Sequence, residues 1–218
     1  MPGKRRTSPD ASRRSEASRR AILTAAFELA GKVGYARLSI EGIAARAGVG
    51  KQTIYRWWPS KGAVLFDAFV ARAEGQGVRP LPDTGDLEAD LKKVLRTAVL
   101  ELNDPRYDEP LRALNTEILH DPELAAAYAE RLEGPVRERR KHRLRSAQRA
   151  GQLPPDLDLD VAIDLLWGPL LNRWLQRGAP LTTKYADTLV RTALNGLRGS
   201  DRSVRATPRR ARPGRAAG

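Results

Sequence analysis

The segment 38–61 constrains this 218-residue chain most, because it predicts two short helices joined by a glycine turn. Ser39 is a natural N-cap for the first helix. Gly48 suits the turn, and Pro59 prevents the second helix from continuing. The pattern predicts a helix-turn-helix, a motif whose second helix fits the DNA major groove. Apolar side chains at helical spacing should form its core: Leu38, Ile40, Ile43, Ala44, Ala47, Val49, Ile54 and Trp58.

Helical periodicity continues outside this motif, and no segment shows the sustained period-two alternation of a strand. We therefore expect an all-α fold, with a three-helix helix-turn-helix domain followed by a larger helical domain. Gly134-Pro135 should kink or split the seventh of about nine helices, and Gly168-Pro169 should kink the eighth. The expected helices cover residues 18–33, 40–46, 50–57, 60–74, 86–103, 107–119, 122–150, 159–177 and 183–197.

Positive charge is concentrated near the two ends of the chain. The formal net charge is +13; residues 1–20 hold seven Lys or Arg and two acids, and residues 198–218 hold seven Arg and one acid. This asymmetry suits a polyanionic partner. The first segment either contacts DNA as an arm or is simply solvated. We interpret the last segment as a solvated, disordered tail.

Several classes of site and protein are excluded or disfavoured. The chain has no Cys, and its two histidines, His120 and His142, are too far apart for a helical zinc motif. No catalytic constellation is visible, so we expect no enzyme activity, metal or cofactor. No apolar run approaches the roughly 20 residues that span a bilayer. The charged N-terminus does not resemble a signal peptide, and we expect a cytoplasmic protein with no membrane partner.

The polar face of the second helix of the motif carries side chains suited to DNA. Lys51 or Arg56 can reach guanine, Gln52 can pair with adenine, and the methyl group of Thr53 can touch thymine. A tyrosine hydroxyl and the start of the next helix, at Lys61, suit phosphate contacts. The alternative is an ordinary helical hairpin with a solvated polar face.

The matching residues of the motif are Ile43-Ala44, Ala47-Gly48-Val49, Thr53-Ile54-Tyr55 and Trp58-Pro59-Ser60-Lys61, after a helix with Ala21-Ile22-Leu23, Ala25-Ala26 and Leu29. This pattern resembles the N-terminal domain of TetR-family transcriptional regulators, in register and without gaps over residues 19–69. Gly62 departs from it, since the family often has Glu there. The resemblance implies phosphate contacts and base contacts. The phosphate contacts fall on Ser39, Tyr55, Trp57 and Lys61, the base contacts on Lys51, Gln52 and Thr53, and Arg56 could serve either role.

The same resemblance implies a helical inducer-binding domain whose last two helices dimerise as a four-helix bundle. The sequence supports a dimer independently, because residues 161–175 are apolar on nearly all sides and must be covered on all sides. A monomer that folds these helices inward is the alternative. The expected interface residues are Leu166, Leu170, Trp174, Leu189, Ala193 and Leu197. The expected pocket residues are Leu95, Val99, Leu102, Leu111, Leu114, Ile118, Tyr128 and Trp167.

A basic run at residues 137–145 lies inside an expected helix. It is either a solvated face or a set of partners for an anionic ligand or DNA. The expected divisions of the chain are a disordered basic arm (1–17), the helix-turn-helix DNA-binding domain (18–59), the helical effector-binding and dimerisation domain (60–197) and a disordered Arg-rich tail (198–218).

Together these observations predict a ligand-responsive transcriptional regulator. We expect a repressor that binds a palindromic double-stranded DNA operator as a homodimer and is released by a small-molecule effector. The alternative from another class is a non-specific architectural DNA-binding protein driven by its Arg-rich ends.

Overall fold

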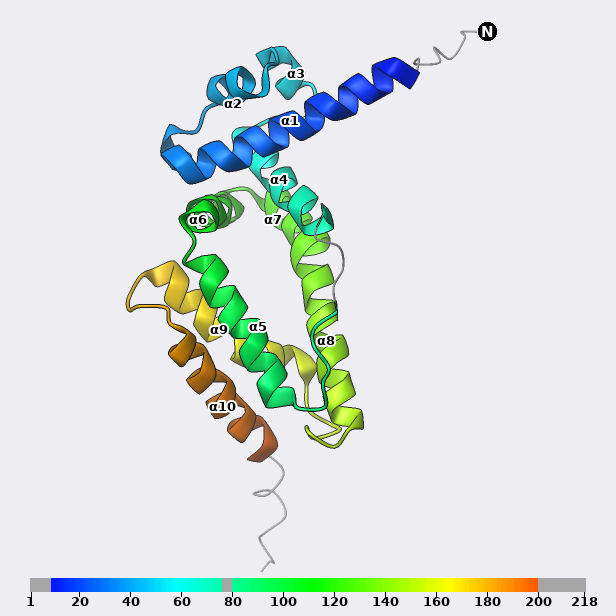
Figure 1. Ribbon diagram of the computed structural model, residues 1–218, viewed down its shortest axis with the longest axis vertical. Coiled ribbons are helices and arrows are strands. Elements are labelled where there is room, and N and C mark those ends of the chain that lie inside the picture. Colours follow the sequence, from blue (N-terminus) through cyan, green and yellow to red (C-terminus); the bar gives the residue numbers. More distant parts are fainter. Residues whose placement is uncertain (1–8, 76–79, 200–218) are drawn as a thin grey trace, which may run out of the picture.

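The computed structural model of the chain describes residues 9–75 and 80–199, which are helical and contain no strand. The expected all-α architecture is confirmed. Figure 1 shows an elongated molecule with α1–α4 at one end and a bundle of α5 and α8–α10 at the other. The α-helices are α1 (Pro9–Val33), α2 (Ile40–Ala47), α3 (Lys51–Tyr55), α4 (Lys61–Gly75), α5 (Leu87–Leu102), α6 (Pro105–His120), α7 (Pro122–Tyr128), α8 (Gly134–Arg149), α9 (Leu159–Gln176) and α10 (Thr183–Gly199).

Local capping residues define the helix-turn-helix. The Oγ of Ser39 accepts a hydrogen bond from the N–H of Gly42 at 3.1 Å, which stabilises the start of α2. Gly48 ends α2 with a φ of 67°, a left-handed conformation that glycine adopts without strain. The expected core is confirmed, with Ile54 of α3 fully buried. Only two of its members are partly rather than fully buried, Ala47 and Val49.

The first helix is longer than the sequence indicated. α1 begins at Pro9, so residues 9–17 are helical and do not belong to a disordered arm. Proline is well tolerated in the first turn of a helix, and Ala, Arg and Glu in this stretch are good helix formers. Residues 1–8 and the Arg-rich tail from residue 200 lie outside the described residues.

The buried side chains form two separate hydrophobic cores. The first core joins α1–α4 with α6 and α7, and the second joins α5 with α8, α9 and α10. Leu111 of α6 packs against both cores. Gly31 of α1 permits a close crossing, because a Cβ there would lie 3.3 Å from the backbone of Arg106. The division between the cores therefore does not coincide with the expected boundary after residue 59.

The expected helix over residues 122–150 is divided by a π-helical turn, η2 (Ala129–Glu133), which separates α7 from α8. Proline has no N–H and its ring clashes with the carbonyl four residues earlier, so Pro135 disturbs the regular ladder at this point. Gly134 also matters, because a Cβ there would lie 3.0 Å from the carbonyl oxygen of Ala129. α9, in contrast, continues through Pro169.

A buried ion pair attaches the connection between α4 and α5 to α8. The Nη2 of Arg143 lies 2.9 Å from a carboxylate oxygen of Asp90, and these side chains are 2 % and 4 % exposed. The Nε of Arg143 donates to the carbonyl of Pro82 at 2.7 Å. Asp90 also accepts from the backbone N–H and the hydroxyl of Thr84. Burial opposes ionisation of Asp90, but these donors outweigh it and hold the pKa of its carboxyl below the ordinary value.

Candidate nucleic-acid interface

α3 presents the predicted reading residues on one face of the molecule. Lys51, Gln52, Tyr55 and Arg56 are exposed, while Thr53 is half-buried. In Figure 1, α2 and α3 lie at the end of the molecule far from the C-terminal end of α10. The structure thus brings the predicted base-contacting residues together on an accessible surface, with Ile54 beneath them in the core.

Lys51 is tethered to the preceding helix. Its Nζ lies 3.0 Å from the Oε1 of Glu41 in α2, and both side chains are more than half exposed. This hydrogen bond to Glu41 raises the pKa of the Lys51 ammonium. Exposed pairs of this kind contribute little to stability. Lys51 can therefore exchange Glu41 for a guanine or a phosphate at small cost.

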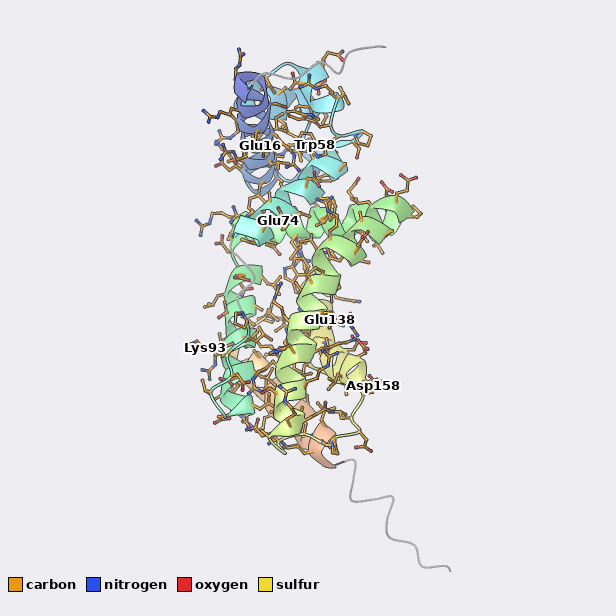
Figure 2. The ribbon with its side chains drawn as sticks, turned by 90° about the vertical axis from the view of Figure 1, so that its right-hand side faces the viewer. Glu16, Trp58, Glu74, Lys93, Glu138 and Asp158 are labelled. Carbon is orange, nitrogen blue, oxygen red and sulfur yellow. The ribbon has the colours of Figure 1, made fainter. Side chains whose placement is uncertain are left out.

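An aromatic platform supports the end of α3. The guanidinium of Arg56 lies 5.1 Å from the centroid of the Trp57 ring, and Trp57 packs edge-to-face on Trp58 at 5.4 Å. The Nε1 of Trp58 donates to Asp67 of α4 at 3.0 Å. Figure 2 shows Trp58 between the helices of this end of the molecule. Trp57 is half-buried, so its indole can meet a phosphate while its ring remains supported.

Two further predicted phosphate contacts already have protein partners. The Nζ of Lys61 donates to the carbonyls of Tyr35 and Leu38, each at 3.1 Å, and lies 4.2 Å from the ring centroid of Tyr35. An ammonium has three donors, so one remains for a phosphate. Ser39 is exposed and uses its oxygen as an acceptor for the N-cap, which leaves the hydroxyl proton to donate. Both remain predicted DNA contacts.

The departure from the family pattern at Gly62 has a structural reason. A Cβ on Gly62 would lie 2.7 Å from the Oε2 of Glu117 in α6. The flexible end of the Glu117 side chain would therefore have to shift to admit a side chain at position 62. A glutamate there would also bring two carboxylates together.

The predicted ligand-pocket residues are not brought together. A cavity of about 490 Å³ lies between α5, α8, α9 and residues 80–82, and of the eight predicted residues only Leu102 and Trp167 line it. Leu95 and Val99 are buried in the second core, because the apolar face of α5 packs on α10. The other four belong to or pack against the first core: Leu111, Leu114, Ile118 and Tyr128.

The face of α5 that lines the cavity was not among the predicted pocket residues. It includes Lys93, Val94, Ala98 and Glu101, which lie beside the apolar face. Mixed polar and apolar character along one helical stripe was the available signal. The basic run of α8 is also more than a solvated face, because Arg139 and Arg140 line the same cavity.

The predicted dimer residues lie mostly inside the chain. Leu166, Leu170 and Trp174 of α9 and Leu197 of α10 are at most 5 % exposed. The two other members are half-buried beside the second core: Leu189 and Ala193. The opposite face of α9 is exposed instead. Its four large apolar side chains are 39–50 % exposed: Val161, Leu165, Leu171 and Leu175.

These features define a class of protein, a helix-turn-helix DNA-binding protein with a separate helical domain that holds a cavity. Within the described ranges, no helix has the length and apolar character needed to cross a membrane. Two family profiles match the chain: "Bacterial regulatory proteins, tetR family" over residues 22–68, and "Tetracyclin repressor-like, C-terminal domain" over residues 81–193. The chain belongs to the TetR family of transcriptional regulators, which are DNA-binding proteins and not enzymes.

Individual relatives agree with this assignment. The chain is 33 % identical over 187 residues to the HTH-type transcriptional regulator YdeS of Bacillus subtilis, covering 86 % of this chain and 93 % of YdeS. It is 30 % identical over 180 residues to the DNA-binding transcriptional repressor TetR of Mycobacteroides abscessus, covering 81 % and 92 %. The crystal structure of the TetR-family regulator SCO0332 superposes with a TM-score of 0.68 at 35 % identity, covering 82 % and 97 %.

Proposed function

We propose that the chain is a cytoplasmic, homodimeric repressor that binds a palindromic operator and is released by a small-molecule effector. The observation that carries DNA reading is the exposed face of α3, where Lys51, Gln52 and Tyr55 stand on a helix anchored by Ile54. Such side chains are suited to base edges and phosphates. Repression is supported by the name of the relative from Mycobacteroides abscessus.

The exposed apolar face of α9 supports the homodimer. A second copy that covers Leu165, Leu171 and their neighbours would remove a contiguous apolar surface from water. A two-fold dimer also presents two recognition helices, which match successive major grooves when they lie about 34–36 Å apart. Dimerisation and operator symmetry therefore belong to one proposal.

A chain of contacts leads from the cavity to α3. Arg140 lines the cavity and donates to Glu133 of the π-helical turn at 3.3 Å. Arg131 of the same turn contacts Asp67 of α4 at 3.0 Å, and Asp67 accepts from Trp58. An effector can act only through a different affinity for the operator-bound and released arrangements. A ligand that displaces the π-helical turn when it binds would have different affinities for these two arrangements.

The test is selection of DNA from a random duplex pool at about 150 mM salt, a concentration that weakens purely electrostatic binding. We expect a two-fold-symmetric motif. As a control, a chain lacking residues 200–218 keeps every described helix and should select the same motif. Enrichment of no motif, with binding that disappears as salt rises or the tail is removed, would contradict the proposal and favour the architectural alternative.

A further inference from the structure

The cavity between α5, α8 and α9 has the size of a small-molecule site and a mainly apolar wall. Its volume is about 490 Å³, within the roughly 300–1,000 Å³ of typical ligand pockets. One wall is the face of α5 that the second core leaves uncovered, and residues 80–82 close one side. The apolar lining includes Val94, Ala98, Leu102, Val136, Trp167 and Leu170.

The charged residues of this lining are unbalanced. Lys93, Arg139 and Arg140 are its cations, and Glu101 of α5 is its only carboxylate. Among the residues that the structure describes, neither Lys93 nor Arg139 makes a side-chain hydrogen bond or an ion pair. Other arginines of the same basic run are paired on the protein, for example Arg137 with Asp160. Within the basic run 137–145, the arginine without a partner among the described residues is therefore one that lines the cavity, Arg139.

Arg140 is the cation held most firmly in the wall. Its side chain is 15 % exposed, and its guanidinium lies 4.6 Å from the ring centroid of Trp167. Burial lowers the pKa of this guanidinium, an effect that the neighbouring Glu133 opposes. A guanidinium keeps its charge in proteins, so the burial is a cost that a second anion would offset.

The hydrogen bonds of Arg140 leave room for such an anion. A guanidinium has five N–H donors arranged to hold a carboxylate or sulfonate in two-point contact. In the described part of the chain, Arg140 uses only Nη1, in a long 3.3 Å bond to Glu133. Arg139 precedes it on the same cavity wall. Figure 2 shows Lys93 on α5 and Glu138, the neighbour of Arg139, on α8 at a similar level of the bundle.

We propose that this cavity binds an amphipathic organic anion, with its apolar body against Trp167 and its acidic group on Arg139 and Arg140. The proposal rests on the proposed function, in which an effector occupies the helical domain. The position of Glu101 on the α5 wall directs the acidic group toward α8. A cationic ligand would have to enter beside three cations, and a neutral one would give no anionic acceptor to the donors of Arg140 that its bond to Glu133 leaves unused.

The test compares two probes of similar shape on the full chain without DNA. The anionic probe is 8-anilinonaphthalene-1-sulfonate and the neutral one is N-phenyl-1-naphthylamine, both followed by fluorescence. We expect the anion to bind about tenfold more tightly than the neutral probe, and Arg139→Gln to remove about that factor. Arg140→Gln should have a similar effect. Arg145→Gln, on the same helix but outside the cavity, is the matched control and should leave the affinity unchanged.

The variant Arg139→Gln keeps the result interpretable if Arg140→Gln fails to fold, because among the described residues Arg139 has no hydrogen-bond or ion-pair partner to lose. Equal affinity for the two probes, or an anion affinity insensitive to Arg139→Gln, would overturn the proposal. Because no DNA is present, that failure is separate from a failure of operator selection. A protein that selects an operator but does not prefer the anionic probe remains a regulator with a different ligand class.

Discussion

The guanidinium of Arg131, in the π-helical turn, lies 3.0 Å from the carboxylate of Asp67 in α4. The other oxygen of Asp67 accepts from the Nε1 of Trp58 and from Arg19 of α1. One carboxylate therefore joins the π-helical turn between α7 and α8 to the helix-turn-helix and to the first helix. α4 follows α3 in the chain, and it is held by this junction together with its packing on α1 and α6.

Coupling through this junction is measurable by a double-mutant cycle on operator affinity. Asp67→Asn should weaken binding more than Arg131→Gln, because it also loosens Trp58, and the two effects should not add. Arg131 is 44 % exposed in this pair, so its own contribution should be about 1 kcal/mol or less. Fluorescence anisotropy on the selected operator provides the four affinities. Strict additivity would show that the two side chains act independently.

Gln52→Ala should relax base preference at one position of each half-site. Loss of a two-point contact with adenine costs about 1–3 kcal/mol of discrimination. Repeating the selection with the variant measures this directly. Tyr55→Phe is the contrasting variant: it should weaken all sequences alike, because a phosphate contact carries no base information. If the selected motif is unchanged with Gln52→Ala, Gln52 is not one of the residues that contact bases.

Lys61→Met should destabilise the fold more than it alters DNA electrostatics. The ammonium of Lys61 bonds two backbone carbonyls near the short turn η1 (Tyr35–Arg37), and hydrogen bonds to charged groups contribute about 1.5–3 kcal/mol each. Because both bonds are removed, urea unfolding should show a loss of about 3 kcal/mol or more. A phosphate contact would instead reduce the slope of log affinity against log salt by about one. A stable variant with the reduced slope would assign Lys61 to DNA alone.

Asp90→Asn should be strongly destabilising, by about 3–5 kcal/mol, because it leaves the buried charge of Arg143 with only the more distant and exposed Asp83 as a counter-ion. Asp83→Asn is the matched control, since Asp83 lies 3.5 Å from the same guanidinium but is 45 % exposed. It should cost less than about 1 kcal/mol. Urea unfolding at neutral pH measures both variants. Similar losses in the two would contradict the special role of the buried pair.

The same pair predicts acid sensitivity. The folded state lowers the pKa of Asp90 below its unfolded value, so its contribution is present above the unfolded pKa and is lost as pH falls through the folded pKa. The free energy of unfolding should therefore drop below about pH 4 in the parent chain. Asp90→Asn should show a shallower acid loss. If the free energy of unfolding of Asp90→Asn falls as steeply with acid as that of the parent chain, other groups cause the acid sensitivity.

Leu165→Glu should convert the proposed dimer into a folded monomer. Leu165 is 48 % exposed within one chain, so the change disturbs a surface and not the core. Leu119→Glu is the control, because Leu119 is 82 % exposed on α6. Sedimentation velocity measures the oligomeric state, and circular dichroism measures the helical content of the variant. A dimer that survives Leu165→Glu would move the interface away from this face of α9.

The sequence predicted those parts of the fold that depend on local spacing. Ser39 and Gly48 define α2 through contacts within a few residues, so the helix-turn-helix was readable without its partners. On α9, Leu165 and Leu166 are equally apolar, and only the packing of α5, α8 and α10 decides that Leu166 is internal. The lining of the cavity could not be predicted for the same reason, since Val94 and Leu95 are adjacent on α5 but only Val94 lines it.

The way in which the helices share the two hydrophobic cores limits where such a regulator can be joined to another one in a hybrid protein. α6 and α7 complete the core around α1–α4. In a hybrid protein joined between α4 and α5, the DNA-binding end would therefore pack against α6 and α7 of the other parent. The α6 of the other parent would have to preserve the close crossing of its backbone at Gly31 and a side chain that fits against Gly62. If the proposed effector binds in the cavity, changes in α5, α8 and α9 around it would alter ligand specificity, whereas α6 would have to be kept together with the DNA-binding helices.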